Sequence, residues 1–328
     1  MTGALAEPRI RIDDRLDGSA GAGLAAEVRD GLTREGLREL PPKLFYDARG
    51  SELFDRITRL PEYYPTRCER SILNRRAPEI VAAAGAEELV ELGSGSASKT
   101  RALLFAMAGA GSLRRYVPVD VSAEPVERSA QELVEVFPGL SVHGLIGDFG
   151  SDLVHLPDGE RRLFAFLGGT IGNLLPGERV EFLAGLRASM GPDDRLLLGT
   201  DLVKDVDVLE AAYDDAAGVT AEFNRNVLRV VNRELDAGFA VERWEHRAFW
   251  DPTEEWIELR LRSRDDVVVP VPGAGIEVPF AAGDEIRTEI SAKFTRERVE
   301  AELGEAGLRV ERFWTDPADW FGLSLSRP

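Results

Sequence analysis

Short apolar runs alternate with amphipathic stretches through the middle of the chain. Five runs have the length and composition of buried strands, at residues 88–92, 116–120, 142–146, 163–167 and 195–199. Between them, segments such as 123–136 and 176–190 repeat their apolar residues at helical spacing. This alternation predicts an α/β fold, with a mainly parallel, Rossmann-like sheet covered by helices on both faces.

Two helices are predicted before this region, over 50–60 and 66–85, because apolar residues recur there at helical spacing. The segment 60–65 (LPEYYP) interrupts them, since its prolines break helical structure. Thr66 and Glu69 stand three residues apart, which is the spacing of a capping box. We therefore expect the second helix to begin with this pair.

The pattern changes after Asp201. One long helical region is predicted over 206–235, and strand-like alternation follows at Ile257, Leu259 and Leu261. A chain of 328 residues is compatible with one large domain or two ordinary ones. The change of pattern favours an α+β unit inserted into the Rossmann-like core.

The C-terminal part predicts a helix over 296–307 and two strands, 309–314 and 321–326, on either side of the Asp316-Pro317 turn. We see no internal repeat or low-complexity tract in the chain. Methyltransferases with a Rossmann-like sheet close that sheet with an antiparallel hairpin of this kind, which a dehydrogenase does not need.

The net charge of the chain is strongly negative. Lysine and arginine number 40 against 58 acidic residues, which gives −18 at pH 7. Such a charge repels phosphate backbones and anionic lipid, so neither nucleic acid nor a membrane is an expected partner. Residues 1–16 contain no apolar core of a signal sequence, and no later run is long enough to span a bilayer. We expect a cytoplasmic protein.

No metal site is predicted. Cys68 is the only cysteine, so it has no partner for a disulfide or a cysteine-rich zinc site. The three histidines, at 143, 155 and 246, are scattered and lack the spacing of metal ligands.

The strongest chemical signal is the glycine pair that follows the first strand. Gly93 and Gly95 let the backbone approach a ligand at a helix N-terminus. A dinucleotide fingerprint requires a third glycine where this chain has Ser98, which disfavours a nicotinamide dehydrogenase. Glu91, two residues before Gly93, suits a ligand with an ammonium group, and S-adenosylmethionine carries one.

Acidic residues follow the next two strands. Asp120 ends the second strand, where a carboxylate can accept hydrogen bonds from ribose hydroxyls. Asp148 and Phe149 follow the third strand and offer an acceptor and an aromatic face to an adenine ring. Each acid alone could be an ordinary loop carboxylate. Together with Glu91 they mark three consecutive strand ends, the edge at which open α/β sheets bind ligands, and this favours a cofactor site.

Several motifs, read together, resemble the histidine-specific Nα-methyltransferase family of ergothioneine biosynthesis. They are residues 60–67 (LPEYYPTR), 91–95 (ELGSG), 147–149 (GDF), 169–174 (GTIGNL), 199–204 (GTDLVK), 212–215 (AYDD), 223–226 (FNRN) and 288–291 (TEIS). The resemblance extends from about residue 40 to the C-terminus. It implies three methyl transfers from S-adenosylmethionine to the α-amino group of L-histidine, giving hercynine. Separately, we expect the protein to be a monomer.

The resemblance also implies a domain division and a set of site residues. A methyltransferase domain of 68–202 and 293–328 would be interrupted by a substrate-binding domain of 16–67 and 203–292, with 1–15 a disordered or extended N-terminus. Substrate contacts would be Asn173 and Tyr213 at the α-amino acid end, Tyr63, Glu289 and Ser291 around the imidazole, and Tyr46 near the amine. Cofactor contacts would be Gly93, Lys99, Asp120, Asp148, Phe149 and Gly168.

Elementary chemistry agrees with these assignments. Glu289 and Ser291 are two residues apart in a predicted strand and therefore point the same way. A buried glutamate rejects side chains that cannot donate to it. Methyl transfer needs a neutral amine, so Asn173 would act by orientation while Tyr46 or a water chain receives the proton.

Two other functions remain open. The chain differs from some family members at Leu259, where they have methionine, and at Ala292, where they have cysteine. An N-methyltransferase of another amino acid, such as tryptophan, is therefore one alternative. The other is a non-catalytic protein that binds S-adenosylmethionine, which would need Gly93 and Asp120 but not Asn173, Tyr213 and Glu289 together.

Overall fold

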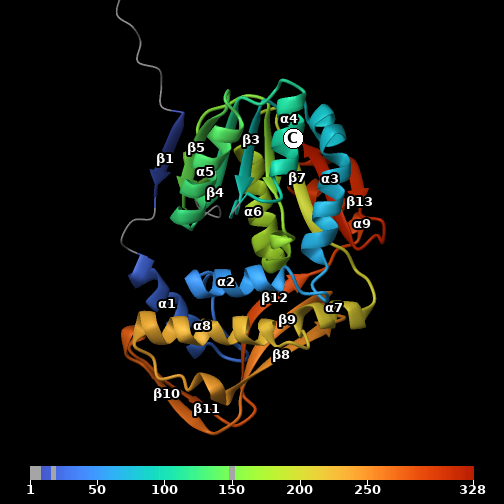
Figure 1. Cartoon of the computed structure of the whole chain (residues 1–328). Coiled ribbons are helices and arrows are strands. Elements are labelled where there is room, and N and C mark those ends of the chain that lie inside the picture. Colours follow the sequence, from blue (N-terminus) through green and yellow to red (C-terminus); the bar gives the residue numbers. More distant parts are fainter. Residues whose placement is uncertain (1–8, 16–19, 96, 148–151) are drawn as a thin grey trace, which may run out of the picture.

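An eight-stranded sheet forms the centre of the larger part of the molecule (Figure 1). The structure is a computed structural model, and it describes residues 9–15, 20–95, 97–147 and 152–328. The six parallel strands of this sheet, in spatial order, are β1 (Ile10–Asp14), β5 (Ser141–Ile146), β4 (Arg115–Asp120), β3 (Glu88–Leu92), β6 (Arg162–Phe166) and β7 (Arg195–Asp201).

An antiparallel hairpin closes this sheet. Strand β14 (Phe321–Arg327) pairs with β7, and β13 (Arg309–Thr315) pairs with β14. The Rossmann-like α/β prediction is confirmed, and so is the C-terminal hairpin.

Helices cover both faces of the large sheet because its strands are apolar on both sides. Along β6, Leu163 and Ala165 belong to one buried cluster while Phe164 and Phe166 belong to another. The first cluster includes helices α3 (Pro65–Ala84), α4 (Arg101–Gly109) and α5 (Ala123–Val136). The second includes α6 (Pro176–Ala188) and α9 (Arg296–Glu305). This two-sided burial is typical of parallel sheets.

A smaller unit lies below the large sheet in Figure 1. Its sheet has the order β2 (Arg38–Glu39), β12 (Glu285–Ala292), β9 (Trp256–Ser263) and β8 (Trp244–Asp251), and a separate hairpin joins β10 (Val267–Val271) to β11 (Ile276–Phe280). The helices here are α1 (Ala20–Thr33), α2 (Ala48–Ile57), α7 (Val206–Tyr213) and α8 (Val219–Leu235). One apolar cluster joins residues from before α3 with residues of the insertion.

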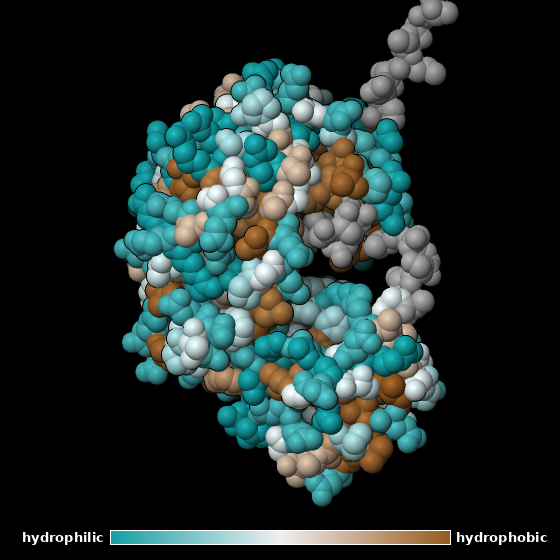
Figure 2. All heavy atoms as spheres, turned by 180° about the vertical axis from the view of Figure 1, so that it is seen from behind, coloured by the Kyte–Doolittle hydropathy of each residue, from teal (hydrophilic) through white to brown (hydrophobic). Residues whose placement is uncertain are grey.

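Short 3₁₀ turns connect several elements. They are η1 (Pro42–Phe45), η2 (Asp152–His155), η3 (Thr170–Asn173), η4 (Val241–Arg243) and η5 (Pro272–Ala274). Figure 2 shows a hollow between the larger and the smaller unit on the rear face. Across the described part of the chain, no helix combines the length and apolar character that crossing a membrane requires.

The predicted single helix over 206–235 is wrong, because the structure has two helices there. The first helix ends at Tyr213, and Gly218, just before the second helix, adopts a left-handed conformation with φ of 70°. The carboxylate of Asp215 accepts hydrogen bonds from the backbone N–H groups of Val219 (2.9 Å) and Thr220 (2.7 Å). These bonds satisfy free donors in the first turn of α8, so the second helix begins where Asp215 caps it.

The N-terminal segment also differs in position. A disordered or extended segment was expected here. Residues 10–14 are extended, and they pair in parallel with β5 as an edge strand of the large sheet. Arg9 holds the start of this strand by donating to the carbonyl groups of Val134 (2.7 Å) and Phe137 (2.8 Å) at the end of α5. Ile10 and Ile12 are its only apolar residues, and this alternation is too short to predict a strand.

Candidate active site

The predicted cofactor loop lies where the strand order of the large sheet reverses. Strand β3 has β4 on one side and β6 on the other, and a ligand crevice forms at the carboxyl end of such a strand. Gly93 and Gly95 turn the chain there with φ of 68° and 47°. The carboxylate of Asp120 accepts hydrogen bonds from the N–H groups of Gly95 (2.8 Å) and Ser122 (2.9 Å). Each oxygen retains a lone pair for a further donor.

Glu69 joins two other predicted cofactor residues. Its side chain is fully buried, and it accepts from Lys99 Nζ at 2.5 Å and from the N–H of Gly168 at 2.7 Å. The predicted capping box is therefore wrong. Helix α3 begins at Pro65 without a side-chain cap, and Glu69 bonds to Lys99 and Gly168 instead of capping the helix. Because the acid bonds to residues 30 and 99 positions away, the local sequence gave no sign of this role.

Glu91 does not offer a free carboxylate to a ligand in this structure. It is 4% exposed and accepts hydrogen bonds from the hydroxyl groups of Thr100 and Tyr116. Burial raises its pKa to about 7, against the effect of these two bonds. We expected Glu91 to face an ammonium group of a ligand. In the structure its carboxylate is bonded to Thr100 and Tyr116 instead. Asp148 and Phe149, the other predicted contacts, lie outside the described residues.

A cavity between the two units brings together all the predicted substrate residues. It is lined by Tyr46, Phe54, Ile57, Tyr63, Pro65, Gly168, Gly169, Thr170, Asn173, Asp201, Ala212, Tyr213, Thr220, Phe223, Leu259, Glu289 and Ser291. Gly168, one of the predicted cofactor contacts, also lines this cavity. Ala292, one of the two departures from the family pattern, does not line it. Its backbone packs against Gly172 instead.

Strand β12 supplies one polar wall of the cavity. Glu289 and Ser291 alternate with Ile290 and face the same side, while Glu289 pairs with Leu259 next to an irregularity in the ladder. Glu289 Oε1 accepts from Asn173 Nδ2 at 3.1 Å. Burial raises the pKa of Glu289 to about 7, and the charge of Lys293 opposes this rise.

Hydroxyl groups form the neighbouring part of this wall. Tyr213 Oη and Ser291 Oγ are 2.8 Å apart, and Lys293 Nζ donates to them at 2.9 and 2.7 Å. Lys293 also pairs with Asp201 at 2.8 Å. The sequence motifs included Asp201, but neither it nor Lys293 was predicted as a site residue, because their pairing joins positions far apart in the chain.

Aromatic rings close the opposite side. The rings of Tyr63 and Tyr213 meet edge to face at 6.2 Å, and Tyr46 packs in the same way against Phe54 (6.2 Å) and Phe223 (6.3 Å). Tyr46 is 39% exposed, whereas Tyr63 is buried. Burial of its hydroxyl, reinforced by the charge of nearby Glu289, raises the pKa of Tyr46, so it is a neutral phenol at physiological pH.

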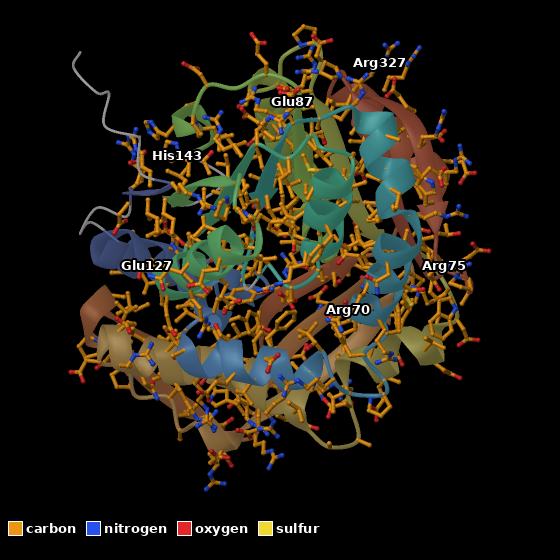
Figure 3. The ribbon with its side chains drawn as sticks, turned by 45° about the horizontal axis from the view of Figure 1, so that its top comes forward. Arg70, Arg75, Glu87, Glu127, His143 and Arg327 are labelled. Atoms are coloured by element: carbon orange, nitrogen blue, oxygen red, sulfur yellow. The ribbon has the colours of Figure 1, made fainter. Side chains whose placement is uncertain are left out.

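The histidines lie in other surroundings. His143 on β5 pairs with Asp13 of the edge strand at 2.8 Å (Figure 3). His246 is buried and contacts Asn224 and the carbonyl of Tyr213, both at 2.9 Å. Within the residues that the structure describes, no group of histidine, cysteine and acidic side chains is arranged to hold a metal ion.

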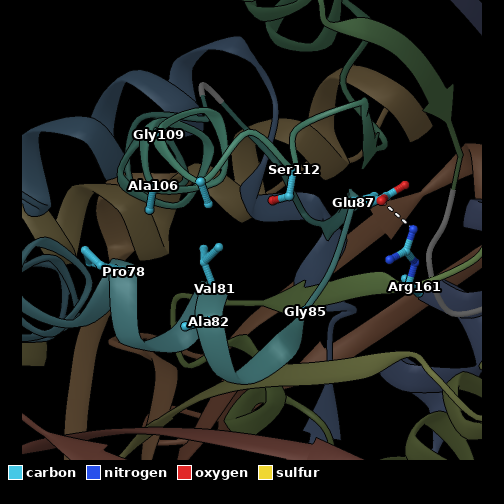
Figure 4. A pocket seen from close by; sticks show the side chains of 10 residues that line it. Pro78, Val81, Ala82, Gly85, Glu87, Ala106, Gly109, Ser112 and Arg161 are labelled. Carbon is cyan, nitrogen blue, oxygen red and sulfur yellow. Dashed lines mark hydrogen bonds and ion pairs between the residues drawn. The ribbon is translucent and has the colours of Figure 1, made fainter.

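A second cavity lies between α3 and α4, away from these residues (Figure 4). Small and apolar residues make up most of its lining, including Val81, Ala82 and Ala106, and the Glu87–Arg161 ion pair stands at its edge. It contains none of the predicted site residues. The cavity between the two units is therefore the candidate active site.

Comparison with known proteins shows the family of the chain. The family model "Histidine-specific methyltransferase, SAM-dependent" matches residues 24–328. The histidine N-alpha-methyltransferase of Mycolicibacterium smegmatis is 56% identical over 94% of this chain and 96% of its own length. That of Mycobacterium tuberculosis is 51% identical over 97% and 99%. Ergothioneine biosynthesis protein 1 of Neurospora crassa is 33% identical over 86% of this chain and 32% of its own length. The chain belongs to the histidine-specific, S-adenosylmethionine-dependent methyltransferase family.

Proposed function

We propose that this protein transfers three methyl groups from S-adenosylmethionine to the α-amino group of L-histidine, giving hercynine in the first step of ergothioneine biosynthesis. The observation that carries the proposal is the single cavity that holds Glu289, Asn173 and Tyr213 and opens beside Gly168. Family membership gives the reaction class, and the presence of Gly168 in the cavity lining supports an acceptor site beside the proposed cofactor site.

The crevice residues fit S-adenosylmethionine. A Cβ built on Gly95 would meet no atom within 4 Å, so the backbone leaves space for a ligand. The free lone pairs of Asp120 suit ribose hydroxyl groups, and the ammonium of Lys99, held by Glu69, suits a carboxylate. When bound, the cofactor supplies an electrophilic methyl group on a sulfonium centre. We assign Gly93, Lys99, Asp120 and Gly168 to this ligand, and we keep Asp148 and Phe149 as proposed adenine contacts.

Glu289 would determine the side-chain preference. A carboxylate in a buried wall can accept a hydrogen bond from an imidazole N–H, with Ser291 and Tyr63 close to the same ring. A side chain without a matching donor would leave this carboxylate unpaired, and that costs free energy. Leu259 lies directly opposite Glu289 in the strand pair and shapes the apolar part of the same wall.

Asn173 and Tyr213 would hold the α-amino acid end and so orient the amine. The reacting amine must be neutral, and the neutral phenol of Tyr46 is a poor final acceptor for its proton. We therefore propose that Tyr46 orients the amine and that water receives the proton. The rings of Tyr46, Tyr63 and Tyr213 can also tolerate the cationic product through cation–π attraction.

The domain division remains part of the proposal. Residues 68–202 and 293–328 would form the methyltransferase domain, and 16–67 and 203–292 the substrate-binding domain. The edge strand at 10–14 extends the first of these. We expect the protein to act in the cytoplasm as a monomer, without a metal ion.

Mass spectrometry tests the proposal directly. The purified protein is incubated with S-adenosylmethionine and each of the twenty amino acids in turn, and added methyl groups are counted. Trimethylation of histidine alone is the expected result. Methylation of another amino acid, such as tryptophan, would overturn the role of Glu289 but keep the chemistry. If no amino acid is methylated, the chain is a binding protein.

A further inference from the structure

Lys293 lies behind the substrate cavity with all its hydrogen-bond donors in use. It follows β12 directly, and its side chain is fully buried. An ammonium group has three N–H donors, and Nζ has three acceptors around it. They are Asp201 Oδ2 at 2.8 Å, Tyr213 Oη at 2.9 Å and Ser291 Oγ at 2.7 Å. The side chain therefore has one fixed position.

Counting protons shows what this position imposes on the two hydroxyl groups. Tyr213 Oη and Ser291 Oγ each accept from Lys293, and they are 2.8 Å from one another. One hydroxyl proton must fill the bond between them, so the other is left over. Both residues line the cavity, and the remaining proton is available to a ligand there. Without Lys293, each hydroxyl could rotate, and no single donor would be fixed.

The charges around Lys293 favour an anionic group at this end of the cavity. Lys204 Nζ also pairs with Asp201, at 2.7 Å, so two ammonium groups share one carboxylate and leave one net positive charge. Burial of Asp201 opposes its ionisation, but both lysines overcome this and lower its pKa. Glu289 stands on the same strand as Ser291, two residues further from Lys293. The wall is thus positive near Tyr213 and acidic at Glu289.

We propose that Lys293, held by Asp201, is a positioning residue that fixes the Tyr213–Ser291 hydroxyl pair so that Ser291 donates to Tyr213 and Tyr213 donates to the carboxylate of the amino acid substrate. This inference rests on the proposed function. It concerns the carboxylate, which all amino acids share, whereas Glu289 concerns the side chain. Lys293 itself does not line the cavity and acts through the two hydroxyl groups.

A purely structural role is the competing explanation. Near Lys293 the chain re-enters the large sheet, since Phe294 N donates to Asp201 O (2.8 Å) and Val203 N donates to Phe294 O (2.9 Å). An ion pair here could serve only to join these segments. Lys204 provides a matched comparison. It pairs with the same carboxylate and is also buried, but its other contacts are Tyr64 Oη and Leu202 O rather than the cavity hydroxyl groups.

Lys293→Met and Lys204→Met therefore separate the two roles, because each removes one ammonium group from Asp201. We expect K293M to raise the KM for the amino acid about 10- to 100-fold, the usual effect of losing a charge-assisted hydrogen bond, with little change in the KM for S-adenosylmethionine. K204M removes the same charge from Asp201 but leaves Lys293 bonded to Tyr213 and Ser291, so it should raise the amino acid KM several-fold less than K293M does. Competition by histamine, which has no carboxylate, gives a second readout. K293M should weaken the binding of histidine much more than the binding of histamine.

The proposal would be overturned if both variants raised the amino acid KM equally. It would also be overturned if K293M weakened the binding of histidine and of histamine to the same extent. If K293M does not fold, Lys293→Gln replaces it, since glutamine keeps neutral donors and should still raise the KM for the amino acid. The wild-type panel of amino acids distinguishes the two proposals. Should the protein methylate a different amino acid, the same variants are tested with that one, and only the histidine assignment fails. If it binds no amino acid, both fail.

Discussion

Asn173 Nδ2 donates to Glu289 Oε1 at 3.1 Å and so connects the two units across the cavity. Asn173 ends the 3₁₀ turn that follows β6 of the large sheet, and Glu289 belongs to β12 of the small sheet. The backbone of this turn also packs against β12, since a Cβ on Gly172 would lie 2.8 Å from Ala292 O. The proposed contact to the imidazole and the proposed contact to the amino acid end therefore depend on one another.

Replacing Glu289 by glutamine tests the proposed imidazole contact. Losing a hydrogen bond to a charged group should raise the KM for histidine about 10- to 100-fold. Because the pKa of Glu289 is raised to about 7, wild-type kcat/KM should increase as the pH rises through this value and the carboxyl group ionises. The pH profile of E289Q should lack this increase and show only the ionisations of histidine itself. A wild-type profile identical to that of E289Q would contradict the assignment.

The same substitution has a predicted effect on stability. The pKa of Glu289 is higher in the folded protein, about 7, than its ordinary value of 4.5, so the folded state binds more protons between these values. The wild type therefore loses stability as the pH rises from 4.5 to 7. E289Q avoids this loss and should be more stable than the wild type by up to about 3 kcal/mol at pH 8. Urea unfolding at pH 5 and pH 8 measures the difference, and an advantage that does not grow with pH would refute it.

Gly172→Ala tests the packing that positions Asn173. The new Cβ would lie 2.8 Å from Ala292 O and 3.1 Å from Ala292 N, so the turn must move away from β12. Overpacking of this kind costs about 1–3 kcal/mol of unfolding free energy, and the KM for histidine should rise as Asn173 moves from Glu289. Gly185→Ala is the control, because its Cβ meets nothing within 4 Å in helix α6 and should stabilise the protein slightly. Unchanged histidine binding in the first variant would argue against this coupling.

The architecture could be predicted from the sequence because local patterns specify it. Apolar runs located the strands of the core, and the glycine pair after β3 predicted the sharp turn that Gly93 and Gly95 form there. The helix break before α8 was missed because Asp215 caps the helix through backbone groups four and five residues ahead, within a continuous apolar pattern. Edge strand β1 was missed because three of its five residues are charged and it pairs with only one neighbouring strand, β5.

The contacts within the site could not be predicted from local patterns, because the partners of buried charged residues lie outside the local sequence. Glu69 had the spacing of a cap but bonds to Lys99, and Glu91 had the position of a ligand contact but bonds to Thr100. Asp201, the last residue of β7, pairs with Lys293, which follows β12 and lies 92 positions later. A polar residue in a motif signals a role, but its partner appears only when the sheets are assembled.

Asp120→Asn tests the cofactor side alone. An amide at this position would direct an NH₂ group at one of the two backbone N–H donors, Gly95 or Ser122, and would lose an acceptor for ribose. The KM for S-adenosylmethionine should rise about 10- to 100-fold, while that for histidine changes little. Glu124→Gln is the matched control, since Glu124 is an exposed acid at the start of the next helix, where it pairs with Arg128. Equal effects of both substitutions would indicate a general charge effect.

Tyr46→Phe decides how the proton leaves the amine. The raised pKa of Tyr46 keeps it a neutral phenol, which can orient the amine but is not an effective final base. Phenylalanine preserves the packing against Phe54 and Phe223, so the variant isolates the hydroxyl group. If Tyr46 only orients, kcat should fall less than about tenfold, with an unchanged pH profile. A loss of about 10²- to 10⁴-fold together with a missing limb of the profile would instead identify Tyr46 as the proton acceptor. Single-turnover measurements across pH 6–9 distinguish these outcomes, because they report methyl transfer without product release.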